Sequence, residues 1–154
     1  MTVIIGLGNS LCADDGAGLE AVRQLVARGG LPPGVRVVEA GCPGLGLLDL
    51  MAGARRAILV DAVVSGAAPG TIHRFTLEAL PPREMFPLSL HGVGAMDALE
   101  LGRLAAADQL PGELVILGVE VADRTPFHRG LGPEVASALP ELITAIWHEL
   151  DPQA

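Results

Sequence analysis

The sequence is poor in aromatic residues, cysteine and positive charge, and each shortage excludes a class of protein. Aromatic residues make up 3% of the 154 residues and tyrosine is absent, so nucleic-acid bases would find little to stack on. The formal net charge of -8 would also repel a phosphate backbone. Cys12 and Cys42 are too few for a disulfide framework and lack the paired spacing of a zinc site. We therefore expect no nucleic-acid partner and a reducing, cytoplasmic environment.

Long apolar runs are missing as well, although hydrophobic residues account for 50% of the chain and the mean hydropathy is +0.47. Gly, Pro or a charged residue interrupts each run well before the roughly 20 residues that cross a bilayer. Residues 1–6 are typical of a strand and not of an export signal, because no basic stretch precedes an apolar segment. The sequence predicts a cytoplasmic protein with no membrane partner, and we take a monomer as the default.

Short β-branched runs alternate with longer amphipathic segments, which is typical of an α/β fold with a mostly parallel sheet. The predicted strands are 3–7, 35–40, 57–62, 71–75 and 114–119, and the predicted helices are 16–27, 44–53, 93–107 and 133–150. The connection before strand 71–75 is too short for a parallel crossover, so we expect this strand to be antiparallel at an edge. Pro140 should kink or restart the last helix. Residues 1–154 are thus predicted to form one three-layer αβα domain, with a five-stranded sheet and helices on both faces.

A glycine-rich loop, residues 6–18, joins the first strand to the first helix. A dinucleotide-binding loop would read G-x-G-x-x-G, but Leu11 stands at the third glycine, and Asp14 and Asp15 would repel a diphosphate. The opening Gly-Leu-Gly-Asn is also similar to that of peptidyl-tRNA hydrolase, where Pro-Gly would follow instead of Ser10-Leu11. A dinucleotide site is therefore disfavoured, and a peptidyl-tRNA-hydrolase-like enzyme stays a distant alternative.

Three polar side chains stand where an open α/β sheet binds its ligands, at the carboxyl ends of the strands. Asp15 follows the first strand, Asp61 closes an apolar strand, and His91 precedes the helix 93–107. Taken singly, Asp14 and Asp15 could be helix-capping acids and His91 an ordinary loop histidine. Taken together, two carboxylates and an imidazole suit a divalent metal with open positions, and nickel, iron, zinc or manganese would fit equally well.

Covalent catalysis is not indicated by the remaining residues. Cys42 with His91 would suggest a thiol protease, but no orienting residue is evident, and a small buried cysteine is the more common situation. The serines lack the G-x-S-x-G pattern, and no H-E-x-x-H sequence is present. The remaining residues therefore offer no covalent nucleophile, whereas a divalent ion could supply both Lewis acidity and an activated water.

Several blocks of sequence resemble the nickel-iron hydrogenase maturation proteases, over about residues 3 to 147. They are Gly6-Leu7-Gly8-Asn9 with Asp14-Asp15-Gly16, Asp61-Ala62 with Pro69-Gly70-Thr71, Ser89-Leu90-His91 with Asp97, and Leu117-Gly118-Val119-Glu120. The resemblance implies an aspartate- and metal-dependent endopeptidase that removes the C-terminal extension of a hydrogenase large-subunit precursor after nickel insertion. It implies that Asp15, Asp61 and His91 contact the nickel that the precursor carries and take part in catalysis, with no organic cofactor.

Two parts of the sequence vary within the family that the chain resembles. Residues 39–44 fall where the family varies with its precursor, so Gly41, Cys42 and Pro43 are predicted to contact the substrate. Many members have Glu where this chain has Asp15, which keeps an oxygen donor but shortens its reach. Asp15 or Asp14 is expected to shuttle a proton. A nickel-sensing chaperone that binds the same precursor without cutting it is the competing hypothesis.

Overall fold

The apolar runs of the sequence become the strands of one five-stranded sheet. In the computed structural model, which describes residues 1–86 and 93–151, the strands are β1 (Thr2–Leu7), β2 (Val35–Gly41), β3 (Arg56–Val63), β4 (Ile72–Thr76) and β5 (Glu113–Glu120). Their order across the sheet is β2-β1-β3-β5-β4. All neighbouring pairs are parallel except β4 and β5, which are antiparallel. The mostly parallel sheet with one antiparallel edge strand is therefore confirmed.

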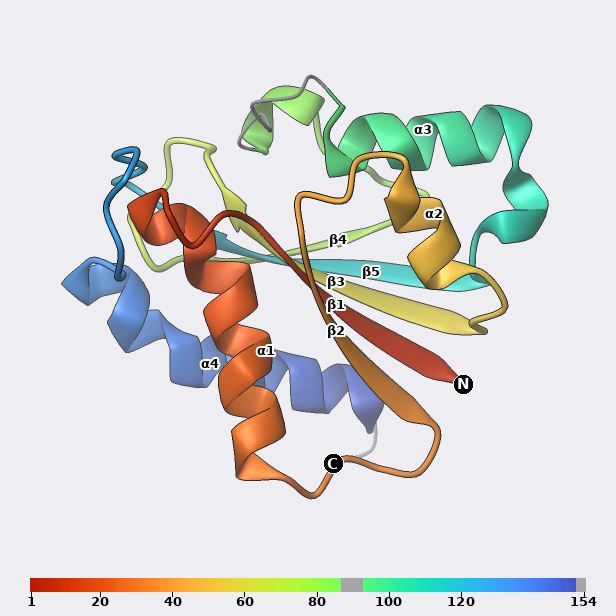
Figure 1. The fold of residues 1–154 in the computed structure, drawn as a ribbon, viewed down its shortest axis with the longest axis horizontal. Coiled ribbons are helices and arrows are strands. Elements are labelled where there is room, and N and C mark those ends of the chain that lie inside the picture. Colours follow the sequence, from red (N-terminus) through yellow and green to blue (C-terminus); the bar gives the residue numbers. More distant parts are fainter. Residues whose placement is uncertain (87–92, 152–154) are drawn as a thin grey trace.

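Helices cover both faces of this sheet, which completes the predicted three layers (Figure 1). The helices α1 (Ala17–Arg28) and α4 (Pro133–Leu150) pack on one face, and α2 (Gly46–Met51) and α3 (Ala95–Ala105) pack on the other. Single 3-10 turns form at η1 (Ala13–Gly16), η2 (Arg83–Met85) and η3 (Ala107–Gln109). The second helix is shorter than the predicted 44–53, because Gly44 and Gly53 have φ angles of 57° and 73°, outside the helical region.

Strand β3 runs through the middle of the sheet and divides its side chains between two cores. Ile58 and Val60 pack with α1 and α4, whereas Leu59 and Val63 pack with α2 and α3. By alternation, Asp61 lies on the same face as Leu59 and Val63, and it is only 8% exposed. The strand continues past Asp61 because residues 61–63 pair with residues 118–120 of β5. A carboxyl group therefore stands in an apolar face.

Helix α4 is continuous through Pro140, so the helix does not restart at this residue, and the alternative of a kink stays a prediction. Pro140 lies on the exposed side of the helix, where water can satisfy the carbonyl group of Ala136 that loses its helical partner. The opposite side is buried against α1 and the sheet, and this burial holds the helix together. An ion pair of 2.5 Å joins Glu149 near its end to Arg56, the first residue of β3. Neither α4 nor any other helix in the described part of the chain is long and apolar enough to span a membrane.

Candidate functional site

The predicted site lies where the winding of the sheet reverses. The chain passes from β1 through α1 to β2 on one side of β1, and then through α2 to β3 on the other side. After β1 the chain enters α1 on one face, whereas after β3 it passes through β4 and enters α3 on the other face. The carboxyl ends of β1 and β3 therefore flank a crevice between them. Asp15 follows β1 and Asp61 lies near the carboxyl end of β3, so both face the usual ligand position of an open α/β sheet.

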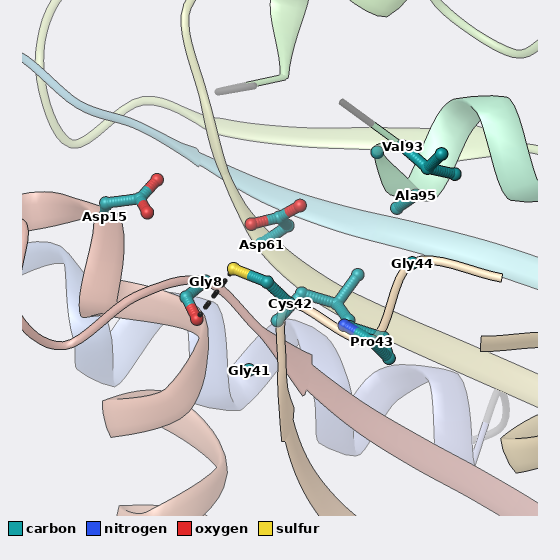
Figure 2. Close-up of a pocket in the computed structure, with 11 residues that line it drawn as sticks. Gly8, Asp15, Gly41, Cys42, Pro43, Gly44, Asp61, Val93 and Ala95 are labelled. Atoms are coloured by element: carbon teal, nitrogen blue, oxygen red, sulfur yellow. Dashed lines mark hydrogen bonds between the residues drawn. The ribbon is translucent and has the colours of Figure 1, made fainter. Parts of the chain in front are cut away.

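A small cavity of about 40 Å³ opens at this point. Figure 2 shows the carboxyl groups of Asp15 and Asp61 on this cavity, together with Cys42 and the backbone before α3. The lining residues are Leu7, Gly8, Asp15, Gly41, Cys42, Pro43, Gly44, Asp61, Val93, Gly94 and Ala95. The structure therefore brings together Asp15, Asp61 and all three predicted substrate contacts, Gly41, Cys42 and Pro43. His91, the third predicted ligand, lies outside the described residues.

The loop that follows β1 holds Asp15 in place. The backbone N–H of Asn9 donates to Oδ2 of Asp15 at 3.1 Å. The preceding residue, Gly8, has a φ of 121°, and a Cβ there would lie 2.0 Å from the carbonyl oxygen of Asp15. Burial raises the pKa of Asp15, whereas the Asn9 hydrogen bond and the positive charge of Arg124 act in the opposite direction. Asp15 is therefore protonated more readily than an exposed aspartate.

Asp61 is the more strongly perturbed of the two acids. Its Oδ1 accepts a hydrogen bond of 2.8 Å from the N–H of Ala62. Burial raises the pKa of Asp61 to about 8, the Ala62 hydrogen bond opposes this, and the negative charge of Asp15 adds to it. Asp61 is thus largely a neutral carboxylic acid at neutral pH. A buried acid beside a second acid in a crevice is typical of sites that transfer protons or bind cations.

The thiol of Cys42 closes the third side of the cavity. It lies 3.6 Å from the carbonyl oxygen of Gly8, to which it donates (Figure 2). Burial raises the pKa of Cys42, and the negative charges of Asp15 and Asp61 raise it further. A thiol that stays protonated at neutral pH is a weak nucleophile. The environment of Cys42 therefore agrees with a substrate contact and not with a thiol protease.

Asp14, the neighbour of Asp15, is directed to a different part of the molecule. Its carboxylate accepts hydrogen bonds from the N–H groups of Gly132 at 2.7 Å, Asp123 at 3.1 Å and Ala122 at 3.4 Å. The side chain is 2% exposed. Asp14 therefore ties down the loop between β5 and α4, and the expectation that it shuttles a proton at the cavity is wrong. The alternative of a cap on α1 is wrong for both acids, because the N-cap residue is Gly16.

Glu120, at the end of β5, is a further buried carboxylate, for which no role was predicted from the sequence. It accepts hydrogen bonds from the N–H and hydroxyl of Ser65 at 2.8 and 2.7 Å and from the N–H of Gly66 at 3.0 Å. Nε2 of His73 lies 2.9 Å from it. Burial would raise the pKa of Glu120, but these hydrogen bonds lower it overall. Glu120 therefore fixes the turn after β3 and the strand β4 against β5.

Within residues 1–86 and 93–151, no group of three His, Cys, Asp or Glu side chains is arranged to hold a metal ion. This finding does not test the predicted set, since His91 lies outside those residues. Asp15 and Asp61 supply oxygen donors on one side of the cavity. Two carboxyl groups of this kind suit an ion whose remaining ligands come from elsewhere.

The fold and the site define a class: a three-layer α/β protein with a small acidic crevice at the point where its sheet reverses, the arrangement expected of an enzyme of this architecture. A family model described as hydrogenase maturation protease matches residues 19–149. The chain belongs to the hydrogenase maturation protease family. The matched residues include Asp61 and begin after Asp15.

Individual relatives agree with this assignment. The hydrogenase expression/formation protein HupM of Azotobacter chroococcum is 36% identical over 147 residues, which cover 89% of this chain and 69% of HupM. The hydrogenase 2 maturation protease of Escherichia coli K12 is 32% identical, with coverage of 94% and 89%. The solved structure of the hydrogenase maturating endopeptidase HybD from Escherichia coli matches with a TM-score of 0.81 at 26% identity, covering 99% of this chain and 93% of HybD. Some curated relatives are longer: the match covers 66% of HoxM from Azotobacter vinelandii.

Proposed function

We propose that this protein is an endopeptidase that removes the C-terminal extension of a nickel-iron hydrogenase large-subunit precursor. Membership of the hydrogenase maturation protease family supports the reaction class. The main structural support is that Asp15 and Asp61 line one small cavity at the point where the winding of the sheet reverses. A buried, largely protonated Asp61 destabilises the fold, and such groups are concentrated at functional sites.

In this proposal the nickel ion of the precursor is part of the substrate and serves as the recognition element. Asp15 and Asp61, together with His91, complete its coordination. The approach of a divalent cation favours the charged form of Asp61, so Asp61 releases its proton as the precursor binds. A precursor without nickel would bring no cation to Asp15 and Asp61, so Asp61 would keep its proton and the contacts to the ion would not form. We therefore expect the nickel-free precursor to bind poorly.

The peptide to be cut lies over the cavity, against Gly41, Cys42 and Pro43. Nickel held there would supply Lewis acidity for the peptide carbonyl or for an attacking water. Asp15 is only half-buried whereas Asp61 is buried, so Asp15 is the group that can take a proton from the water and return it to the departing amine. Asp61, once ionised, balances the charge of the ion.

The proposal is tested by following the intact mass of the nickel-loaded precursor with the wild-type protein and with Asp61→Asn and His91→Ala. Each variant should slow cleavage by about 100-fold or more, because it removes a contact to the ion whose Lewis acidity contributes several kcal/mol to the stabilisation of the transition state. Asp108→Asn, an exposed aspartate in η3, is the matched control and should cleave at the wild-type rate. If Asp61→Asn and His91→Ala both cleave at that rate, the three-residue site is wrong. Nickel-dependent complex formation without any loss of mass would instead favour the chaperone hypothesis.

A further inference from the structure

Phe127 is a fully exposed aromatic residue in a backbone conformation that residues other than glycine rarely adopt. It is 93% exposed and has a φ of 60°. The chain has three Phe, one Trp and no Tyr. The rings of the other two Phe residues, Phe75 and Phe86, pack edge to face, with 6.2 Å between the ring centroids. A left-handed backbone at a residue other than glycine costs free energy, and residues strained in this way cluster at functional sites.

The loop that carries Phe127, residues 121–132, is firmly held. The N–H of Ala13 donates to the carbonyl of His128 at 2.8 Å, and the N–H of His128 donates to the carbonyl of Leu11 at 3.1 Å. The buried carboxylate of Asp14 binds N–H groups near both ends of the loop, at Asp123 and Gly132. The conformation of Phe127 is thus fixed before any partner arrives, which lowers the entropic cost of binding.

The same loop is continuous with the rim of the candidate active site. Leu11 is 40% exposed, and its carbonyl accepts a hydrogen bond from the N–H of His128. It lies in the same loop as Asn9, whose N–H donates to the carboxylate of Asp15. Asp14, which closes the loop, directly precedes Asp15. Figure 1 shows the connection between β5 and α4 beside the η1 turn that contains both acids. The loop that carries Phe127 therefore adjoins the loop that holds Asp15, and the charge of Arg124 in it acts on Asp15.

We propose that Phe127, with Leu11 on the neighbouring loop, is a docking anchor that inserts into an apolar pocket on the folded part of the precursor while the extension enters the cavity. This inference rests on the proposed function. A cavity of about 40 Å³ can hold only a small part of a protein substrate, so most of the contact must lie on the surrounding surface.

The charges around Phe127 indicate the chemistry of the partner surface. Arg124 and Arg129 lie on either side of Phe127 in the sequence, in a chain whose net charge is -8, and the charge of Arg124 acts on Asp15 at the cavity. Aromatic residues and arginines are the residue types that dominate binding energy at the centres of protein interfaces. The pocket on the precursor is therefore expected to be apolar with an acidic edge.

The test uses variants that remove the ring while tolerating the left-handed backbone, Phe127→Gly and Phe127→Asn. Both should keep the wild-type melting temperature or raise it, because the strained conformation is relieved. With the full-length, nickel-loaded precursor, KM should rise about tenfold or more with little change in kcat, as expected for the loss of an interface anchor. Leu104→Ala is the matched control, since Leu104 is an 85% exposed apolar residue on α3, and its KM should equal that of the wild type.

The possible outcomes separate this inference from the proposed function. If the wild-type protein cleaves the precursor and both Phe127 variants keep the wild-type KM, the docking anchor is wrong while the endopeptidase stands. If Leu104→Ala raises KM as much as the Phe127 variants, the effect is a general one of exposed apolar surface and the anchor is again wrong. If the wild-type protein does not cleave the precursor, the proposed function fails and this inference fails with it.

Discussion

Asp61 keeps its proton in the folded protein over a pH range in which an exposed aspartate is ionised. Burial, with a contribution from the charge of Asp15, raises its pKa from 3.8 to about 8. In the unfolded chain the proton leaves near the lower value, whereas in the folded chain it leaves near the higher one. Between these values the folded state binds a proton that the unfolded state does not, so stability falls as the pH rises.

The substitution Asp61→Asn preserves the shape of this side chain and removes its titration. The free energy of unfolding of the wild type should fall between about pH 4 and about pH 8 and level off above, while the variant should lose most of this slope. Asp15, whose pKa is also raised, would supply what remains. Above about pH 8 the variant should be the more stable by on the order of a few kcal/mol. Denaturant unfolding at several pH values measures this, and an unchanged slope would contradict the perturbed pKa of Asp61.

Among the elements, helix α4 shows how burial can outweigh local propensity. Proline in a helix interior removes a hydrogen bond and clashes with the preceding turn, which favours a break. At Pro140 the helix continues because the residue is on the exposed side, and a long apolar face opposite it is buried, namely Val135, Ala138, Leu139, Leu142, Ile143 and Ile146. The free-energy cost of the proline is thus offset by the burial of the apolar face of the helix.

Replacing this proline should therefore stabilise the protein. Pro140→Ala restores an N–H for the carbonyl of Ala136, and we expect a gain of about 1 to 3 kcal/mol in the free energy of unfolding. Pro133→Ala is the matched control, because Pro133 is the first residue of α4, where the missing N–H has no helical partner to lose. Urea unfolding of both variants gives the comparison. Equal stability of Pro140→Ala and the wild type would mean that the backbone at this position has adapted fully to proline.

The same elements show how far sequence reasoning could reach. The strands followed from their apolar runs, and the short connection between β3 and β4 was enough to predict the antiparallel edge. Asp15 and Asp61 could be assigned to one crevice because the carboxyl ends of parallel strands meet at one edge of a sheet. This step needed only the identity of the strands.

Other features depend on contacts that no local pattern reveals. Asp14 had the sequence context of a proton shuttle or a helix cap, but its hydrogen-bond donors at Asp123 and Gly132 lie more than a hundred residues further along the chain. Glu120 similarly acquires its partners Ser65 and His73 from a distant part of the chain. The fold brings these donors to the carboxylates, so their roles became visible only in three dimensions.

At the scale of the whole molecule, ion pairs stabilise the edge of the sheet at the amino ends of its strands, and the candidate site lies at the carboxyl ends. Near the amino ends of the strands, Arg56 pairs with Glu149 at 2.5 Å and with Glu113 at 3.1 Å, which joins β3 to the end of α4 and to β5. The acidic cavity and the loop with Phe127 lie at the carboxyl ends. In our proposal the cavity recognises nickel and the loop recognises the folded precursor, so the protein acts only where both are present.

Incubation of the wild-type protein with nickel-loaded and nickel-free hydrogenase large-subunit precursor, followed by intact mass, tests this account most directly. We predict that the nickel-loaded precursor loses its C-terminal peptide and that the nickel-free precursor keeps its full mass. Equal cleavage of both forms would contradict nickel as the recognition element. An unchanged mass in both would contradict the endopeptidase itself.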